Sequence, residues 1–258
     1  HAVIEAITFD FWDTLAVDDS DEAKRCALGL PSKQEARIKL FAQKVMQNHP
    51  QISARKAAAA YQRANERFRR VWHDEHHTPA VATRISYAYE ELGLLPPPGQ
   101  YARLMREIDE LVREIEVMEV RIPPDFVPGV HTTLQILASQ YKLAIISDTI
   151  HTNGRGLRGL LAQQGILPYF SQQLFSDEVG VSKPSSQIFR TAATLLDIPP
   201  ERIVHVGDRE SNDIDGPLAI GMRAILFTGA IDRNQGKTRA HAICHHFSAL
   251  PEIVQRLR

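Results

Sequence analysis

The sequence has little cysteine, almost no net charge and no long apolar run. Only two cysteines, Cys26 and Cys244, occur in 258 residues, and they lack the spacing of metal ligands, as expected in a reducing compartment. The formal net charge of -1, from 30 basic and 31 acidic side chains, gives no general attraction to nucleic acid or to anionic membranes. No stretch approaches the roughly 18 apolar residues that a membrane helix requires. We therefore expect a cytoplasmic protein whose partner is a small molecule, and neither nucleic acid nor a membrane.

The composition is that of a folded chain. Hydrophobic residues make up 43% of the sequence and charged residues 24%, and internal repeats and low-complexity tracts are absent. A chain of this length accommodates one large domain and an inserted second domain.

An apolar run opens the chain. Residues Ala2 to Phe9 are rich in Val, Ile and Phe, which predicts a buried strand of a parallel sheet. The run stops at Asp10, and parallel sheets bind ligands at the carboxyl ends of their strands. Asp10 is therefore a candidate reactive group. Taken alone, this stretch favours a simpler interpretation, in which Asp10 or Asp13 only caps a turn.

Three later stretches repeat the order of apolar strand, polar loop and helix, each with a different chemical group in the loop. The groups are a hydroxyl at Ser147, a lysine at Lys183, and paired acids at Asp208 and Asp213. Together with Asp10, this order and these spacings resemble the haloacid dehalogenase (HAD) superfamily, in its phosphatase-like branch.

The resemblance covers both ends of the chain, residues 2–15 and about 127–229. It implies an α/β fold, in which a Rossmann-like parallel sheet core carries an inserted α-helical cap. The hydrophobic pattern agrees, because strands and helices alternate toward the C-terminus, whereas the middle of the chain shows unbroken helical periodicity. We therefore expect an α/β core of residues 1–16 and 123–258 and a helical cap of residues 17–122. In that family the cap closes over the active site and selects the substrate.

A phosphate ester requires an oxygen nucleophile in line with the leaving group and positive charge around the remaining phosphate oxygens. The resemblance implies that Asp10 is the nucleophile and forms an aspartyl-phosphate. Because a phosphate dianion repels a carboxylate, a cation is needed, and Asp10 and Asp208 offer the oxygen ligands that Mg²⁺ prefers. The family also uses the backbone carbonyl two residues after the nucleophile, here that of Trp12. Asp213 either holds metal-bound water or only caps the following helix.

Two further groups would bind the phosphate. Lys183 would neutralise the charge of both the phosphate and Asp10, and its alternative is a surface lysine before a proline turn. Ser147 would donate its hydroxyl to a phosphate oxygen, helped by the backbone amides of Asp148 and Thr149, and its alternative is a structural serine. Only the order of the groups favours the functional interpretation. Asp148 departs from the neutral residue that is common there, and we assign no catalytic role to it.

Trp12 is the main departure from the family pattern. HAD phosphatases carry a second aspartate two residues after the nucleophile, which protonates the leaving oxygen and later activates water. This chain has Trp12 there and an acid, Asp13, one residue later, so the acid-base group is missing or displaced. Related dehalogenases also lack an acid at that position, so a 2-haloacid dehalogenase-like hydrolase is the first alternative. The acidic pocket expected around Asp208 and Asp213 argues against it.

Two clusters outside these motifs have simpler explanations. The run from His73 to His77 follows an amphipathic helix, and we expect a solvated helix end or loop rather than a metal site. Four arginines that crowd one cap helix are expected to form a solvated face: Arg63, Arg67, Arg69 and Arg70. An arginine of this group that pointed into the core would be the natural partner of an anionic substrate tail.

The sequence therefore predicts a Mg²⁺-dependent HAD-type hydrolase that cleaves phosphate from a small phosphorylated metabolite. The second alternative is a catalytically weak protein that binds phosphorylated metabolites. Mg²⁺-dependent turnover separates the phosphohydrolase, the dehalogenase and the binding protein. Dehalogenation would proceed with a chelator present, and a binding protein would be stabilised by its ligand without turnover. No feature of the sequence indicates the oligomeric state.

Overall fold

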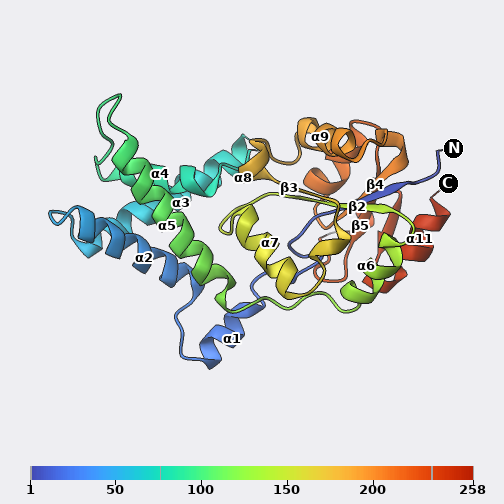
Figure 1. The fold of residues 1–258 in the computed structure, drawn as a ribbon, viewed down its shortest axis with the longest axis horizontal. Helices are drawn as coiled ribbons and strands as arrows, with labels where there is room; N and C mark the ends of the chain where they lie inside the picture. Colours follow the sequence, from blue (N-terminus) through green and yellow to red (C-terminus); the bar gives the residue numbers. More distant parts are fainter. Residues whose placement is uncertain (1, 76, 234, 258) are drawn as a thin grey trace. The chain divides into compact units, whose positions relative to one another are not determined.

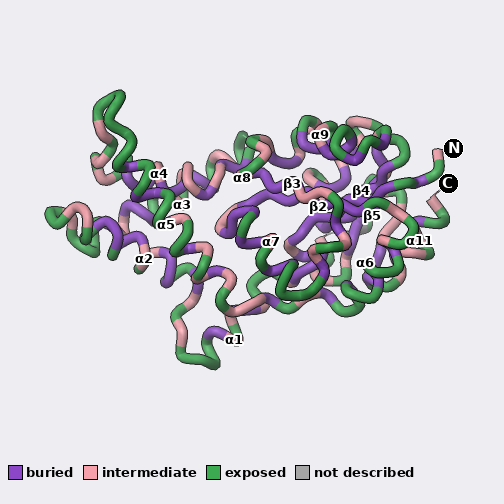
Figure 2. The backbone as a smooth tube through the Cα atoms, viewed as in Figure 1, coloured by how far each residue is buried: buried purple, intermediate pink, exposed green. Residues whose placement is uncertain are grey.

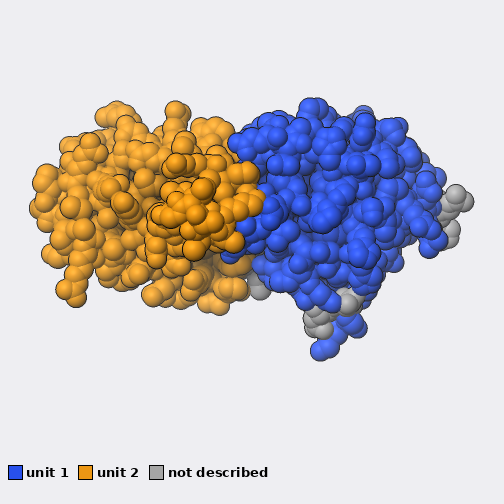
Figure 3. Space-filling model, turned by 90° about the horizontal axis from the view of Figure 1, so that it is seen from below, with its two compact units in different colours: residues 1–20, 124–148, 158–258 blue, residues 21–123, 149–157 orange. Residues whose placement is uncertain are grey.

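The chain, described by a computed structural model for every residue except 1, 76, 234 and 258, forms two compact units (Figure 3). Unit 1 contains residues 1–20, 124–148 and 158–258, and unit 2 contains residues 21–123 and 149–157. Residues 149–157 thus cluster with the helices of unit 2, although they follow a strand of unit 1 in sequence. The assignment of the two units as core and cap stays a prediction.

The centre of unit 1 is a parallel β-sheet, which confirms the predicted α/β fold class. Its described strands follow the order β3-β2-β1-β4-β5-β6 (Figure 1). They are β1 (Ala6–Phe9), β2 (Lys142–Ser147), β3 (Gln172–Phe175), β4 (Ile203–Gly207), β5 (Arg223–Phe227) and β6 (Ala242–Cys244). Phe9 of β1 pairs with Ile145 on one side and with Val206 on the other. The carboxyl ends of β1 and β4 are therefore neighbours.

Helices cover both faces of this sheet (Figure 1). α9 (Ser186–Leu196) lies on one face, where Ile188 and Phe189 join Ala6 and Ala144 in a buried apolar cluster. α6 (Val130–Ala138) and α11 (Leu250–Arg256) lie on the other face. The strands between them are buried along most of their length (Figure 2).

Shorter elements complete unit 1. They are α8 (Ser176–Val179), α10 (Gly216–Leu218), the π-helical segment η3 (Glu210–Asp215), and the 3-10 turns η1 (Leu167–Tyr169), η2 (Pro200–Arg202), η4 (Gln235–Lys237) and η5 (Phe247–Ala249). α7 (Gly154–Gln163) begins in unit 2 and ends in unit 1. The stretch 213–220 is not one regular helix but is divided between η3 and α10. Pro217 supplies a reason, because it has no backbone N–H for the helical ladder.

Unit 2 consists of helices wherever apolar residues recur at helical spacing. They are α1 (Asp21–Ala27), α2 (Lys33–Asn48), α3 (Ala54–Asp74), α4 (Val81–Glu91) and α5 (Ala102–Arg121). Ser32 and Ser53 cap α2 and α3 by accepting a hydrogen bond from a first-turn N–H, which stabilises a helix start. A buried core joins α2 to α5 through Phe41, Tyr89 and Leu111. In the described part of the chain, no helix has both the length and the hydropathy needed to cross a membrane.

Candidate active site

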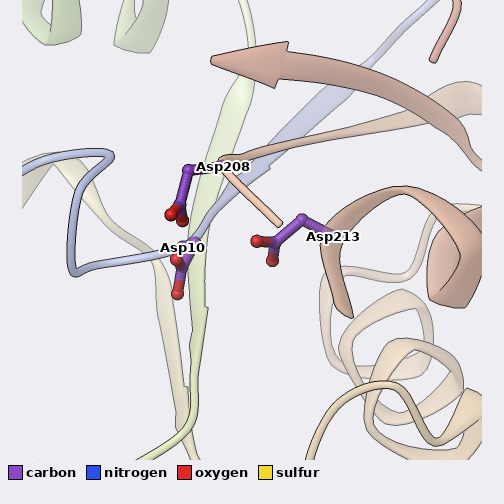
Figure 4. Close-up of side chains that lie close together, drawn as sticks. All are labelled: Asp10, Asp208 and Asp213. Atoms are coloured by element: carbon purple, nitrogen blue, oxygen red, sulfur yellow. The ribbon is translucent and has the colours of Figure 1, made fainter. Parts of the chain in front are cut away.

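Three buried carboxylates meet at the carboxyl edge of the sheet. Asp10 directly follows β1, Asp208 directly follows the neighbouring β4, and Asp213 lies in η3. Their side chains turn toward one another (Figure 4), and one oxygen of each lies within 4.8 Å of the others. Their exposed fractions are 8%, 2% and 0%. The parallel pairing of β1 and β4 explains this meeting, because it brings two strand ends of distant sequence to one place.

Lys183 lies between two of these acids. Its Nζ atom is 2.8 Å from Oδ1 of Asp10 and 2.7 Å from Oδ1 of Asp213, and the side chain is buried. Its backbone N–H donates to Oδ1 of Asp148 at 2.9 Å. The structure therefore places Lys183 beside the acids and holds its backbone through Asp148. Lys183 is not the surface lysine that the sequence alone also allowed.

Of the three carboxylates, Asp213 has the most hydrogen-bond partners. Besides Lys183, it accepts hydrogen bonds from Nε2 of His205 at 2.9 Å and from the backbone N–H of Arg209 at 3.0 Å. Burial alone would raise its pKa, but the charge of Lys183 and the bond from His205 hold that pKa below the ordinary value. A Cβ atom on Gly207 would lie 2.2 Å from Cγ of Asp213, so only glycine leaves room for this carboxylate.

His205 is a member of the site that the sequence analysis missed. It is fully buried in β4, and its Nδ1 atom lies 2.7 Å from Oγ1 of Thr8. Burial lowers its pKa below the ordinary value, although Asp213 acts in the opposite direction. A neutral ring that donates from Nε2 to Asp213 and accepts from Thr8 satisfies both contacts. A lone histidine inside an otherwise apolar strand was the available signal.

Asp10 and Asp208 lie in an environment that disfavours the charged form of a carboxylate. Burial raises the pKa of Asp10, while Lys183 opposes the shift. Burial and the neighbouring carboxylates Asp10 and Asp213 raise the pKa of Asp208 to about 8. Oδ1 of Asp208 is buried without a hydrogen-bond partner. An unpartnered carboxylate oxygen beside two further carboxylates is the donor set that a hard divalent cation such as Mg²⁺ prefers, so the residues fit that ion.

Arg233 is a second residue that the sequence analysis missed. Its Nε atom lies 2.8 Å from Oδ2 of Asp208, and its Nη2 atom lies 3.2 Å from Oδ2 of Asp13. The other oxygen of Asp13 accepts a hydrogen bond from the backbone N–H of Asp18 at 3.0 Å. Asp13 is therefore buried with both oxygens occupied, in a left-handed backbone conformation with φ of 57°. No sequence pattern distinguishes Arg233 from other loop arginines.

The remaining predicted residues lie at or shortly after the ends of β1 and β2. Ser147 is buried at the end of β2, where its hydroxyl donates to the carbonyl of Asp148 at 3.2 Å. Burial raises the pKa of Asp148 to about 6, although Lys183 opposes the shift. Thr149 is buried and belongs to unit 2. Trp12 is half-buried and packs edge-on against Phe11 at 4.8 Å between ring centroids. The roles of these residues stay predictions.

The clusters outside the motifs are less informative. His73 is exposed at the end of α3, and His76 lies outside the described residues. Within the residues that the structure places, the only group of three or more candidate metal ligands is Asp10, Asp208 and Asp213. Arg63 and Arg67 pair with Glu91 and Glu90 on the surface, in agreement with a solvated face.

Comparison with known proteins identifies the family. The family description "haloacid dehalogenase-like hydrolase" matches residues 4–221. The chain is 36% identical over 101 residues to the glyceraldehyde 3-phosphate phosphatase of Methanopyrus kandleri. This aligned stretch covers 38% of this chain and 40% of that protein. The chain is also 36% identical over 88 residues to the human haloacid dehalogenase-like hydrolase domain-containing protein 3, 34% of each chain. These matches thus span less than half of each relative.

Solved structures agree in fold. A 2-haloacid dehalogenase from Pseudomonas syringae pv. Tomato DC3000 superposes with a TM-score of 0.67 at 21% identity, over 99% of this chain and 100% of that one. A HAD phosphatase from Thermococcus onnurineus gives a TM-score of 0.62 at 21% identity, over 97% and 98% of the two chains. At this identity the likeness establishes the fold alone. The chain therefore belongs to the haloacid dehalogenase-like hydrolase family.

Proposed function

We propose that this protein is a Mg²⁺-dependent phosphohydrolase that cleaves phosphate from a small phosphorylated metabolite through an aspartyl-phosphate at Asp10. The observation that carries the proposal is the arrangement around Asp10. One of its carboxylate oxygens is held by Lys183, and an unpartnered oxygen of Asp208 lies in the same buried cluster. This combines a nucleophile, a fixed cation and a place for a second cation, which are the parts that phosphoryl transfer requires.

Asp10 acts as the nucleophile. A carboxylate oxygen of Asp10 forms a bond to phosphorus, the bond from phosphorus to the leaving oxygen breaks, and water later hydrolyses the aspartyl-phosphate. Lys183 supports the first step by favouring the ionised form of Asp10 against the effect of burial, and by offsetting the charge of the phosphate oxygens. His205 and Arg209 position Asp213, which in turn orients the ammonium group of Lys183.

The residues that would hold Mg²⁺ are the carboxylates of Asp10 and Asp208 and the backbone carbonyl of Trp12. Asp213 would either hold a water of the ion or act only through Lys183. When bound, the ion supplies positive charge that reduces the repulsion between Asp10 and a phosphate dianion. Ser147 and the backbone amides of Asp148 and Thr149 would bind the phosphate oxygens.

The names of the relatives support the substrate class. Relatives include phosphatases of glyceraldehyde 3-phosphate and of phosphoserine, and a 5-amino-6-(5-phospho-D-ribitylamino)uracil phosphatase. All of these substrates are small phosphorylated metabolites. We extend this class, and none of the individual substrates, to the present chain.

The missing acid at position 12 restricts the leaving group. Trp12 has no carboxyl group that could protonate the leaving oxygen, and both oxygens of Asp13 are occupied by Arg233 and Asp18. General acid catalysis contributes roughly 10²- to 10⁴-fold, most for a poor leaving group. We therefore infer a preference for acyl phosphates, anhydrides or aryl phosphates over sugar and alkyl phosphates.

A dehalogenase is the second candidate, and Trp12 is the observation that favours it. A dehalogenase would displace halide with Asp10 without a metal ion. The experiment is to assay aryl phosphates and 2-haloacids with Mg²⁺ and with a chelator. Phosphate release that the chelator abolishes supports the phosphohydrolase, and halide release that persists with chelator would replace it. Stabilisation by a phosphorylated ligand without turnover would identify a binding protein.

A further inference from the structure

A basic cavity of about 150 Å³ lies within unit 2. All nine of its lining residues belong to that unit, and none of them is an acid. Three are arginines: Arg37 from α2, Arg69 from α3 and Arg84 from α4. A concave site lined by one sign of charge concentrates ions of the other sign, so the cavity favours an anion.

Arg84 is the unusual member of this group. It occupies a core position of α4, on the buried stripe formed with Val81, Ile85 and Ala88, and is only 3% exposed. Its Cζ atom lies 3.6 Å from the centre of the Phe68 ring, so an aromatic face covers one side of the guanidinium group. Its Nε atom is buried without a hydrogen-bond partner. A buried charge normally has an oppositely charged partner, because removing it from water is costly.

The protein itself supplies no such partner. Among the described residues no carboxylate forms an ion pair with Arg84, and the buried acid Glu119 is paired with Arg37 at 2.5 Å. Burial lowers the pKa of Arg84 to about 10, which still leaves it charged at neutral pH. Arg84 instead donates from Nη1 to Oδ1 of Asn65 and to Nδ1 of His151, each at 3.0 Å.

The remaining edge of the guanidinium group defines the ligand. Because Nη1 is engaged by Asn65 and His151, the N–H groups of Nε and Nη2 remain, and these two point in parallel. Two parallel N–H donors match the two oxygens of a planar carboxylate. We propose that the cavity around Arg84 is a binding site for the carboxylate group of a small organic acid.

The same chemistry admits two sources of the carboxylate. It belongs either to the phosphorylated substrate itself or to a separate acid that binds to unit 2. The binding site does not depend on the proposed phosphatase activity, and the tests below keep the two apart.

The first experiment measures thermal stability of the full chain with glycolate and with the neutral analogue glycolamide at equal ionic strength. Variants are Arg84→Met, which removes the charge at similar volume, and Arg63→Met, which removes an exposed arginine paired with Glu91 on the neighbouring helix. We expect about 20 mM glycolate to raise the Tm of wild type and of Arg63→Met by about 2 °C or more, and glycolamide to have no effect. Arg84→Met should lose the response. An equal response to glycolamide, or an unchanged response in folded Arg84→Met, would overturn the proposal.

A second measurement uses the wild-type protein and holds even if Arg84→Met does not fold. Burial and the nearby arginines keep the pKa of His151 well below its ordinary value. A carboxylate on Arg84 cancels part of that positive charge, so glycolate should raise the pKa of the His151 imidazole in an NMR titration, with His151→Gln used for assignment. A pKa that stays the same with saturating glycolate contradicts the site.

Kinetics identify the source. If the substrate carries the carboxylate, Arg84→Met raises KM for 2-phosphoglycolate by about tenfold or more and leaves KM for ethyl phosphate unchanged. If a separate acid binds, both KM values stay the same while glycolate binding is lost. Absence of phosphatase activity would defeat the proposed function and leave the binding result standing.

Discussion

Nζ of Lys183 lies 2.8 Å from Oδ1 of Asp10, and both side chains are buried. A lysine in this position favours the charged form of the proposed nucleophile inside a site where burial opposes charge. The same lysine contacts Asp213 at 2.7 Å, so one cation stabilises two buried carboxylates.

Replacement of Lys183 therefore should affect activity and stability together. Lys183→Met leaves Asp10 and Asp213 without their cation, and breaking a buried pair typically costs about 3–5 kcal/mol. We expect a fall of that size in the free energy of unfolding and a loss of phosphatase activity of about 100-fold or more. Chemical denaturation and kcat/KM measure the two effects. Exposed Lys237→Met is the control, and a Lys183→Met variant as stable as this control would contradict the ion-pair account.

Gly207 should be essential for the position of Asp213. In Gly207→Ala the new Cβ would lie 2.2 Å from Cγ of Asp213, so the carboxylate has to move away from Lys183. Overpacking of this kind costs about 1–3 kcal/mol, and we expect activity to fall with stability. Gly159→Ala in α7 is the matched control, because its Cβ would meet nothing within 4 Å. Equal melting temperatures of the two variants would show that the site tolerates the side chain.

The raised pKa of Asp208 predicts a pH effect in the absence of Mg²⁺. An unfolded aspartate titrates near 3.8, whereas burial and neighbouring acids raise the folded pKa to about 8. Between these values the folded state binds the proton of Asp208 more tightly than the unfolded state does. Protonation of Asp208 therefore stabilises the folded state fully below about pH 4, and this stabilisation is lost as the pH rises to about 8. Denaturation in a chelator should give a more negative slope of stability against pH for wild type than for Asp208→Asn. Asp109→Asn, an exposed helix substitution, should keep the wild-type slope, and identical slopes in all three proteins would refute the shift.

Trp12 provides a test of the missing acid. Trp12→Asp restores a carboxyl group where HAD phosphatases have one. Trp12→Asn is the control, because asparagine has the size of aspartate but no acidic group. We expect wild type to hydrolyse phenyl phosphate about 100-fold faster than ethyl phosphate, and Trp12→Asp alone to reduce that ratio. Comparable rates on both esters in wild type would remove the leaving-group proposal. Selective loss of ethyl phosphate hydrolysis in Asp13→Asn would show that Asp13 is the displaced acid.

The acids that directly follow strands could be predicted from the sequence, whereas an arginine in a loop and an arginine at a core position could not. Asp10 and Asp208 follow β1 and β4, and parallel pairing makes such strand ends neighbours in space. Arg233 lies in a loop 25 residues after Asp208, where no periodicity indicates a direction for the side chain. Arg84 sits on the buried stripe of α4, so its charge is hidden among residues that follow an ordinary helical pattern of core packing.

Rapid-quench analysis of phenyl phosphate turnover tests the central claim most directly. With Mg²⁺ present, we predict a burst of phenol and a phosphoryl group on the peptide that contains Asp10, because the enzyme lacks an acid at position 12 to activate water for the second step. A chelator or Asp10→Asn should abolish both the burst and the label. Undiminished turnover by Asp10→Asn, or steady turnover by wild type with no phosphoryl group on that peptide, would contradict the account.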